Sequence, residues 1–248
     1  MMHRDCGFVL TAMLIAAIAG DAYGGVIVGG SDLLTAGDVT QLESWLGEGP
    51  LILTNVFDKS AGDTATDFHD AVDGLGATFS IIEITGGYGI TAPVIVGGYN
   101  PYSWDVSLGS YRITSPGDRD AFLFNLTDSD VRYQNPTDAS GELQTMNHLG
   151  HGPSFGGGTD LYVDSSLTSG SSYAFSYGTE TGGIPIGFGG ALAGTGTGSD
   201  SLTYGQIEVF TVTSAESVPE PSTLALLGLG GLGLCGHRWR RKRKNAAT

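Results

Sequence analysis

Two histidines and an aspartate lie close together in the middle of the chain, and their types suggest metal chemistry. His148 and His151 are three residues apart, and Asp160 follows nine residues later. Zinc takes imidazole nitrogens at such spacings, but a third nitrogen or sulfur ligand is missing, and Asp160 could add only oxygen. We therefore expect histidines of a glycine-rich surface loop, with no metal and no cofactor.

Hydrolytic chemistry would need an activated nucleophile or a pair of carboxylates. Ser154 lies near His151 but lacks the Gly-x-Ser-x-Gly turn that exposes a serine nucleophile. Glu208 could form a carboxylate pair with Asp73 or Glu83, although the sequence does not fix their separation. We expect no catalytic residue, and a hydrolase acting on extracellular polysaccharide or peptidoglycan stays as an alternative function.

Calcium chemistry is a third option, which Asp128-Ser129-Asp130 raises. These two carboxylates lack the turn glycine and the later glutamate of an EF-hand loop, so we interpret them as a solvated turn. A calcium-dependent adhesion protein therefore stays as a second alternative function.

A glycine-rich corner runs from Gly150 to Val163 and contains the run Gly156-Gly157-Gly158. No Lys-Ser/Thr pair follows the three glycines, and the next residues have the pattern of a strand, which excludes a phosphate-binding loop. The run instead predicts a tight corner where a side chain would clash or where φ is positive.

Charge limits the partners of the middle of the chain. Residues 25–217 contain 23 acidic and four basic residues, a formal net charge of −19. The basic residues are Lys59, Arg112, Arg119 and Arg132. This charge repels phosphate backbones, so we expect no nucleic-acid partner and instead an extracellular polysaccharide or a basic protein. The only cysteines, Cys6 and Cys235, lie outside this region.

The first 24 residues have the pattern of a secretory signal peptide. His3 and Arg4 precede an apolar run over residues 8–19, and the small residues Ala22 and Gly24 follow it. We predict cleavage by signal peptidase after Gly24, which makes the chain an exported protein.

The last 31 residues, 218–248, have three parts in order: Pro219-Glu220-Pro221, an apolar run over 224–236, and a basic cluster. A thirteen-residue helix is about 20 Å long, shorter than the roughly 30 Å hydrocarbon core of a bilayer. The leucines of the run are Leu224, Leu226, Leu227, Leu229, Leu232 and Leu234, and the basic residues are Arg238, Arg240, Arg241, Lys242, Arg243 and Lys244.

This tail resembles the PEP-CTERM sorting signal in each part. The resemblance implies that the tail inserts transiently into the inner membrane with its basic residues in the cytoplasm. An exosortase then cuts near Pro219-Glu220-Pro221, so the protein reaches the cell surface or the exterior. The basic cluster favours the same orientation.

Periodicity predicts a mostly β fold with two flanking helices. Thr35 and Asp38 begin a helix that ends at Gly47, and Thr64 begins another that ends at Gly74. Short apolar or alternating runs then predict an antiparallel two-sheet β-sandwich, and residues 187–200 predict a surface loop. The predicted strands are 51–53, 79–84, 93–96, 121–126, 160–163, 172–177 and 206–212.

Residues 25–217 resemble the TLDc domain, most specifically in the run from Gly152 to Tyr162. The resemblance implies a TLDc-like β-sandwich and a structural role for the shared residues, but no reaction. Val72 stands where many relatives have Cys, so a thiol role there does not transfer. The shared residues are Gly97, Gly98, Tyr99, Trp104, Phe122, Phe124, Gly152, Pro153, Phe155, Gly156, Gly157, Gly158, Asp160, Leu161, Tyr162 and Glu208.

Overall fold

The computed structural model of the chain describes residues 24–87, 89–137, 139–157, 159–178, 192 and 199–215. The predicted signal peptide up to residue 23, Gly158 and the sorting tail lie outside the described residues. Most of the predicted loop 187–200 also lies outside them, but its last two residues belong to a strand, which corrects that part of the prediction.

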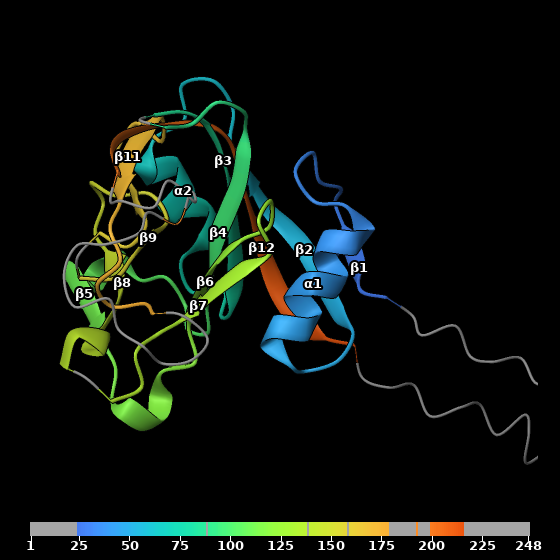
Figure 1. The fold of residues 1–248 in the computed structure, drawn as a ribbon, viewed down its shortest axis with the longest axis horizontal. Coiled ribbons are helices and arrows are strands. Elements are labelled where there is room, and N and C mark those ends of the chain that lie inside the picture. Colours follow the sequence, from blue (N-terminus) through green and yellow to red (C-terminus); the bar gives the residue numbers. More distant parts are fainter. Residues whose placement is uncertain are drawn as a thin grey trace, which may run out of the picture.

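Nine of the described strands form one large sheet, and three form a smaller one (Figure 1). The prediction of a mostly β fold with two sheets is confirmed, and the arrangement is consistent with a β-sandwich. The large sheet has the order β1 (Val26–Val28), β2 (Leu51–Asp58), β12 (Ser199–Ser214), β3 (Thr78–Gly86), β4 (Val94–Asn100), β6 (Phe122–Asn125) and β7 (Asp130–Tyr133), and β11 (Ser169–Ser172) joins β10 (Tyr162–Val163) to β12. The smaller sheet has the order β5 (Ser110–Ile113), β8 (Leu143–Asn147) and β9 (Ser154–Phe155).

One strand pair departs from the predicted antiparallel pattern. β1 pairs with β2 in parallel, with Val26 opposite Ile52, whereas the other pairs of named strands among the described residues are antiparallel. Parallel neighbours need a crossover connection, and helix α1 (Ala36–Leu46) supplies it. A strand of three residues is too short to be recognised by alternation in the sequence.

Both predicted helices are present, and each begins at its predicted cap. α1 follows Thr35, whose hydroxyl accepts a hydrogen bond from the third helical residue, and it ends at Gly47, where φ is +76°. α2 (Ala65–Val72) follows Thr64, whose backbone N–H donates to the Asp67 carboxylate at 2.8 Å. These reciprocal bonds satisfy donors that the first helical turn leaves without partners.

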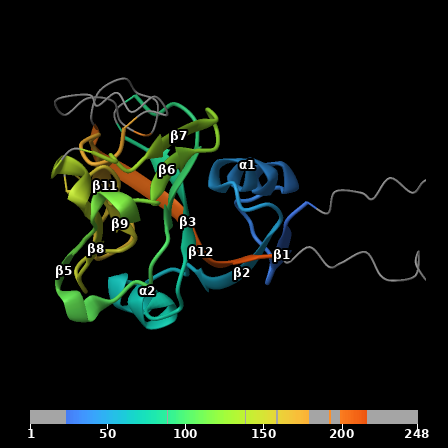
Figure 2. The same cartoon turned by 90° about the horizontal axis from the view of Figure 1, so that it is seen from below.

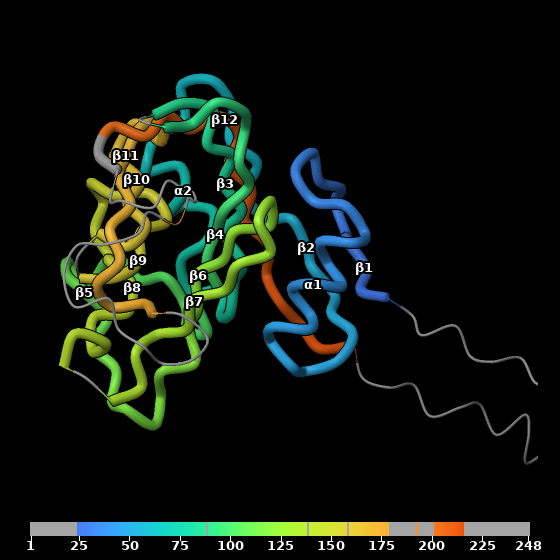
Figure 3. Tube along the Cα trace, viewed as in Figure 1, coloured from blue at the N-terminus to red at the C-terminus, as the bar shows by residue number. Residues whose placement is uncertain are grey.

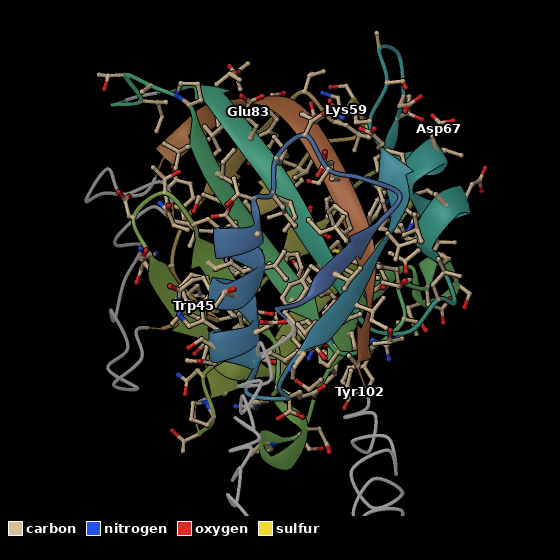
Figure 4. The ribbon with its side chains drawn as sticks, turned by 90° about the vertical axis from the view of Figure 1, so that its right-hand side faces the viewer. Trp45, Lys59, Asp67, Glu83 and Tyr102 are labelled. Atoms are coloured by element: carbon tan, nitrogen blue, oxygen red, sulfur yellow. The ribbon has the colours of Figure 1, made fainter. Side chains whose placement is uncertain are left out.

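The large sheet separates two apolar clusters (Figures 1 and 2). On one face α1 covers Phe79 and Phe124, and Figure 4 looks onto this face. On the other face α2 and the smaller sheet cover Ile82 and Val209. Neighbouring residues of one strand, such as Ile81 and Ile82, therefore enter opposite clusters, because side chains alternate along a strand.

The predicted strand 172–177 is wrong beyond Ser172, where β11 ends. The backbone N–H groups of residues 175–177 donate instead to the side-chain carboxylate of Asp160. β10 is also shorter than the predicted run, since it begins only at Tyr162. The buried Asp160 side chain therefore accepts the hydrogen bonds that these N–H groups would have made to a neighbouring strand.

Both ends of the described domain lie beside the start of β2. Val26 is opposite Ile52, and Ser214 is opposite Leu51. Figure 3 shows β1 and the end of β12 on one side of the molecule, with β5, β8 and β9 on the other. Among the described residues, no helix has the length and apolar character needed to span a membrane.

Candidate functional site

The glycine corner links β9 to β10 in a closed loop. Phe155 N–H donates to Leu161 O at 2.7 Å, and Leu161 N–H donates back to Phe155 O at 3.2 Å. The N–H of Gly156 donates to Gln144 O on β8 at 2.9 Å. The corner is therefore fixed both to itself and to the smaller sheet.

Asp160 anchors the corner from inside. Its Oδ1 accepts hydrogen bonds from the backbone N–H groups of Phe175 at 2.6 Å, Ser176 at 2.9 Å and Tyr177 at 2.9 Å. Burial raises the pKa of this carboxyl to about 6, and the three bonds oppose the rise. Since its lone pairs already have these partners, Asp160 is an anchor for residues 175–177 rather than a free ligand.

Gly156 and Gly157 are constrained for different reasons. Gly156 has φ +78°, and a Cβ there would lie 1.9 Å from Asp160 Oδ2. Gly157 is not among the positive-φ glycines, and a Cβ there would lie 2.2 Å from Leu143 Cδ1. The sequence predicted that the three-glycine run has a positive φ or leaves no room for a side chain. Both hold at Gly156, and only the lack of room holds at Gly157.

A pocket of about 190 Å³ opens beside this corner, and we call it the corner pocket. Three of its residues form a row across the smaller sheet: Tyr111 on β5 is opposite Met146 on β8, which is opposite Ser154 on β9. Paired positions place their side chains on one face of a sheet. Tyr162 from β10 and His151 complete the walls.

His151 lines this pocket, and the ring of His148 lies beside it, with ring centroids 5.3 Å apart. The exposed His148 accepts a hydrogen bond from Gly150 N–H on its Nδ1 at 3.0 Å. Burial lowers the pKa of His151, and the neighbouring His148 and His69 lower it further. His151 is therefore uncharged at neutral pH, and its buried Nδ1 has no hydrogen-bond partner within the described part of the chain.

A larger, open pocket of about 510 Å³ shares one lining residue with the corner pocket, and we call it the outer pocket. Tyr162 lines both pockets. The outer pocket is bordered by Asp164, Ser169 and Ser171 on one side and by Ser201 and Thr203 of β12 on the other. Asp164 is already occupied, because its carboxylate accepts bonds from Ser166 Oγ and Ser169 Oγ at 2.9 and 2.7 Å.

Glu208 has different hydrogen-bond partners from the two histidines. It is 1% exposed, and its carboxylate accepts hydrogen bonds from Ser31 Oγ at 2.5 Å and Asp32 N–H at 2.6 Å. Asp160 and the two histidines bond to other partners. The four side chains therefore do not form one constellation, and the described residues contain no group of three or more His, Cys, Asp or Glu that could hold a metal.

The other two carboxylates considered for hydrolysis also have separate partners. The Asp73 carboxylate accepts hydrogen bonds from His69 Nδ1 at 2.8 Å and from Val106 N–H at 2.8 Å. Glu83 accepts from the backbone N–H of Gln206 at 3.2 Å and lies at the same end of the sheet as Lys59 (Figure 4). None of these bonds joins Asp73 or Glu83 to Glu208.

The remaining residues of the TLDc resemblance lie at packing positions. A Cβ on Gly97 would lie 2.1 Å from Ser80 O, and one on Gly98 would lie 2.6 Å from the Phe155 ring. Trp104 is buried and donates through Nε1 to Thr78 Oγ1 at 3.0 Å. Tyr99, Phe122 and Phe124 belong to the cluster under α1, Gly152 and Pro153 are buried beside the corner, and Leu161 belongs to the opposite cluster.

No pattern in the sequence identified Tyr111, Met146 or Ser171 as pocket residues. Each lies on a short strand whose register is fixed only by pairing with distant segments. Tyr162 was identified through the TLDc resemblance, which carries no information about a pocket.

A comparison with curated proteins finds no match to the chain. The PEP-CTERM protein-sorting motif matches residues 217–242, a range that includes Pro219, Glu220 and Pro221. This motif implies processing by an exosortase, export, and a surface or extracellular location. Residues 217–242 therefore mark the chain as an exported protein that an exosortase sorts to the cell surface or the exterior.

Proposed function

We propose that the chain is a surface or extracellular-matrix protein whose residues 25–217 form a TLDc-like module that binds or supports without catalysis. The observation that carries the proposal is the sorting motif at 217–242, which begins three residues after β12 ends at Ser214. A folded β domain directly before a sorting signal is the part that processing would deliver outside the cell.

The bonding of Ser154, Asp160 and Glu208 supports a module without catalysis. Ser154 Oγ accepts from Val163 N–H at 3.0 Å and donates to Val163 O at 3.3 Å, so it bridges β9 and β10. Asp160 and Glu208 hold backbone segments in the same way. A nucleophile or general base needs a group that is free to contact a substrate.

The steric role of the shared glycines fits the structural role that the TLDc resemblance implies for them. Gly97 and Gly98 bring β4 against β3 and against Phe155, where any side chain would collide. A family pattern that preserves these glycines is explained by packing alone, so it needs no active site.

Processing at both ends completes the proposal. Signal peptidase removes residues 1–24, and the apolar run 224–236 then holds the protein in the inner membrane with Arg238 and the following basic residues in the cytoplasm. Exosortase cleavage near Pro219-Glu220-Pro221 releases the module from this intermediate.

The sorting step is tested by changing Pro219, Glu220 and Pro221 to alanine in the full chain. We expect uncleaved protein in the inner-membrane fraction, because the residues before the apolar run direct the cut. Immunoblots of membrane and released fractions measure the outcome, and Glu216→Ala, just outside the matched range, is the control. Release of a shortened triple variant, as in the parent, would contradict the sorting role.

A further inference from the structure

We propose that the corner pocket and the outer pocket form one binding site for an uncharged glycan, with Tyr162 between two subsites. The inference rests on the proposed function, because it names the ligand class of the exported module. Tyr162 lines both pockets and is paired with Ser171 across β10 and β11.

The pocket sizes favour a chain of small rings. The corner pocket has about 190 Å³, below the roughly 300–1,000 Å³ of pockets that take drug-sized molecules. It suits one terminal ring. The outer pocket has about 510 Å³ and is open, so further units of the same chain can continue past Tyr162 into solvent.

The lining of the corner pocket matches the two kinds of surface on a sugar ring. A pyranose has apolar C–H faces and a rim of hydroxyls. Tyr111, Phe155 and Tyr162 supply aromatic surface, and Met146 adds an adaptable apolar contact. Uncharged polar groups at the edges of such a surface can fix the orientation of the hydroxyls.

His151 supplies a polar group with unused bonding capacity. Its buried Nδ1 lacks a partner within the described ranges, although its ring packs against Tyr162 with centroids 5.3 Å apart. A neutral imidazole has one nitrogen that donates a hydrogen bond and one that accepts. A sugar hydroxyl can both donate and accept, so it can bond to either nitrogen. A buried polar atom without a partner costs stability. We expect a hydroxyl bound in the corner pocket, which His151 lines, to supply the missing partner.

The charge around the site selects an uncharged glycan over an acidic one. Among the described residues that line the two pockets there is no Lys or Arg, and Asp164 borders the outer pocket. The bonds from Ser166 and Ser169 to Asp164 lower the pKa of that carboxyl against the opposing effect of its burial, so it stays ionised. A uronic-acid unit would meet this carboxylate within a domain that is already strongly acidic.

The test uses the full chain purified in detergent and four tetrasaccharides as probes. Cellotetraose, maltotetraose and mannotetraose are uncharged, and tetragalacturonate is acidic. Saturation-transfer NMR detects binding, and calorimetric titration gives Kd. We expect at least one uncharged probe to bind, tetragalacturonate not to bind, and Tyr162→Ala to weaken binding by about tenfold or more through lost aromatic contact.

Two further variants separate the site from general effects. His151→Phe keeps a ring but removes its nitrogens, so it should also weaken binding, and it decides the matter if Tyr162→Ala does not fold. Tyr102→Ala is the control, because Tyr102 is also partly buried but packs against Arg112 outside both pockets. It should bind like the parent.

The proposal is overturned if no uncharged probe binds, if tetragalacturonate binds as tightly, or if Tyr162→Ala and His151→Phe both bind like the parent. These outcomes leave export and sorting untouched, since fractionation of the Pro219-Glu220-Pro221 variant tests those separately. Shortening of a bound probe would support the site and contradict the module without catalysis.

Discussion

At the scale of single residues, Asp160 links the stability of the domain to pH. Its pKa is raised to about 6 in the folded protein, against 3.8 for the ordinary group, because burial outweighs its hydrogen bonds. The folded state therefore binds this proton more tightly than the unfolded state. The resulting stabilisation is fully present below pH 3.8 and is lost as pH rises through about 6.

This linkage is tested with Asp160→Asn, which cannot ionise. The free energy of unfolding of the parent, relative to the variant, should fall by about 1 to 3 kcal/mol between pH 4 and pH 7, at about 1.4 kcal/mol per pKa unit. Urea denaturation at each pH measures the difference. A difference that does not change with pH would mean that the three backbone hydrogen bonds cancel the effect of burial.

The two described glycines of the run Gly156-Gly157-Gly158 should differ in their tolerance of alanine. Gly156→Ala places a side chain at φ +78° and against the Asp160 carboxylate, so we expect a loss of about 1 to 3 kcal/mol. Gly157→Ala should cost less, because φ is not positive there and the atoms that a Cβ would meet all belong to the Leu143 side chain. Urea midpoints of the two variants at one pH give the comparison, and equal losses would contradict the distinction.

At the scale of elements, Glu208 joins the central strand to the chain segment before α1. Ser31 Oγ donates to Glu208, and the same oxygen accepts from Leu34 N–H at 2.8 Å. The Ser31 hydroxyl therefore connects β12, through Glu208, to the turn that leads into α1. Removing it leaves a buried carboxylate with one partner fewer, a change that costs stability.

Ser31→Ala should accordingly loosen residues 31–34 without unfolding the sheet. We expect faster amide hydrogen exchange in that turn and a loss of about 1 to 3 kcal/mol in the free energy of unfolding. Glu208→Gln and the double variant complete a mutant cycle, for which we expect a coupling of about 0.5 to 3 kcal/mol. Additive single effects would show that the two side chains act independently.

Elements that depend on local signals were predictable from the sequence, and the site was not. Thr35 and Gly47 mark the two ends of α1, and they were predictable because capping involves residues within a few positions of one another. β9 has only two residues, and its place depends on Met146 and Leu161. The role of Asp160 could not be read from the sequence either, because its partners lie 15 to 17 residues away and are backbone groups.

At the scale of the whole molecule, acidity and topology give the domain two distinct sides. Figures 1 and 2 place β5, β8, β9 and β11 on the side away from β1 and the end of β12. These four strands contribute to the pockets, together with β10 and the first part of β12. The formal charge of −19 on residues 25–217 keeps phosphate-rich surfaces away from both sides.

The position of β12 also has a mechanical consequence. The strand lies between β3 on one side and β2 and β11 on the other, and its last paired residue, Ser214, leads to the sorting segment. Ladder hydrogen bonds run across the strands, so a pull along β12 loads many of them together in shear instead of opening them one at a time. A module held by its C-terminal end while it binds a ligand at the far side would therefore carry tension through β12, the longest of its described strands.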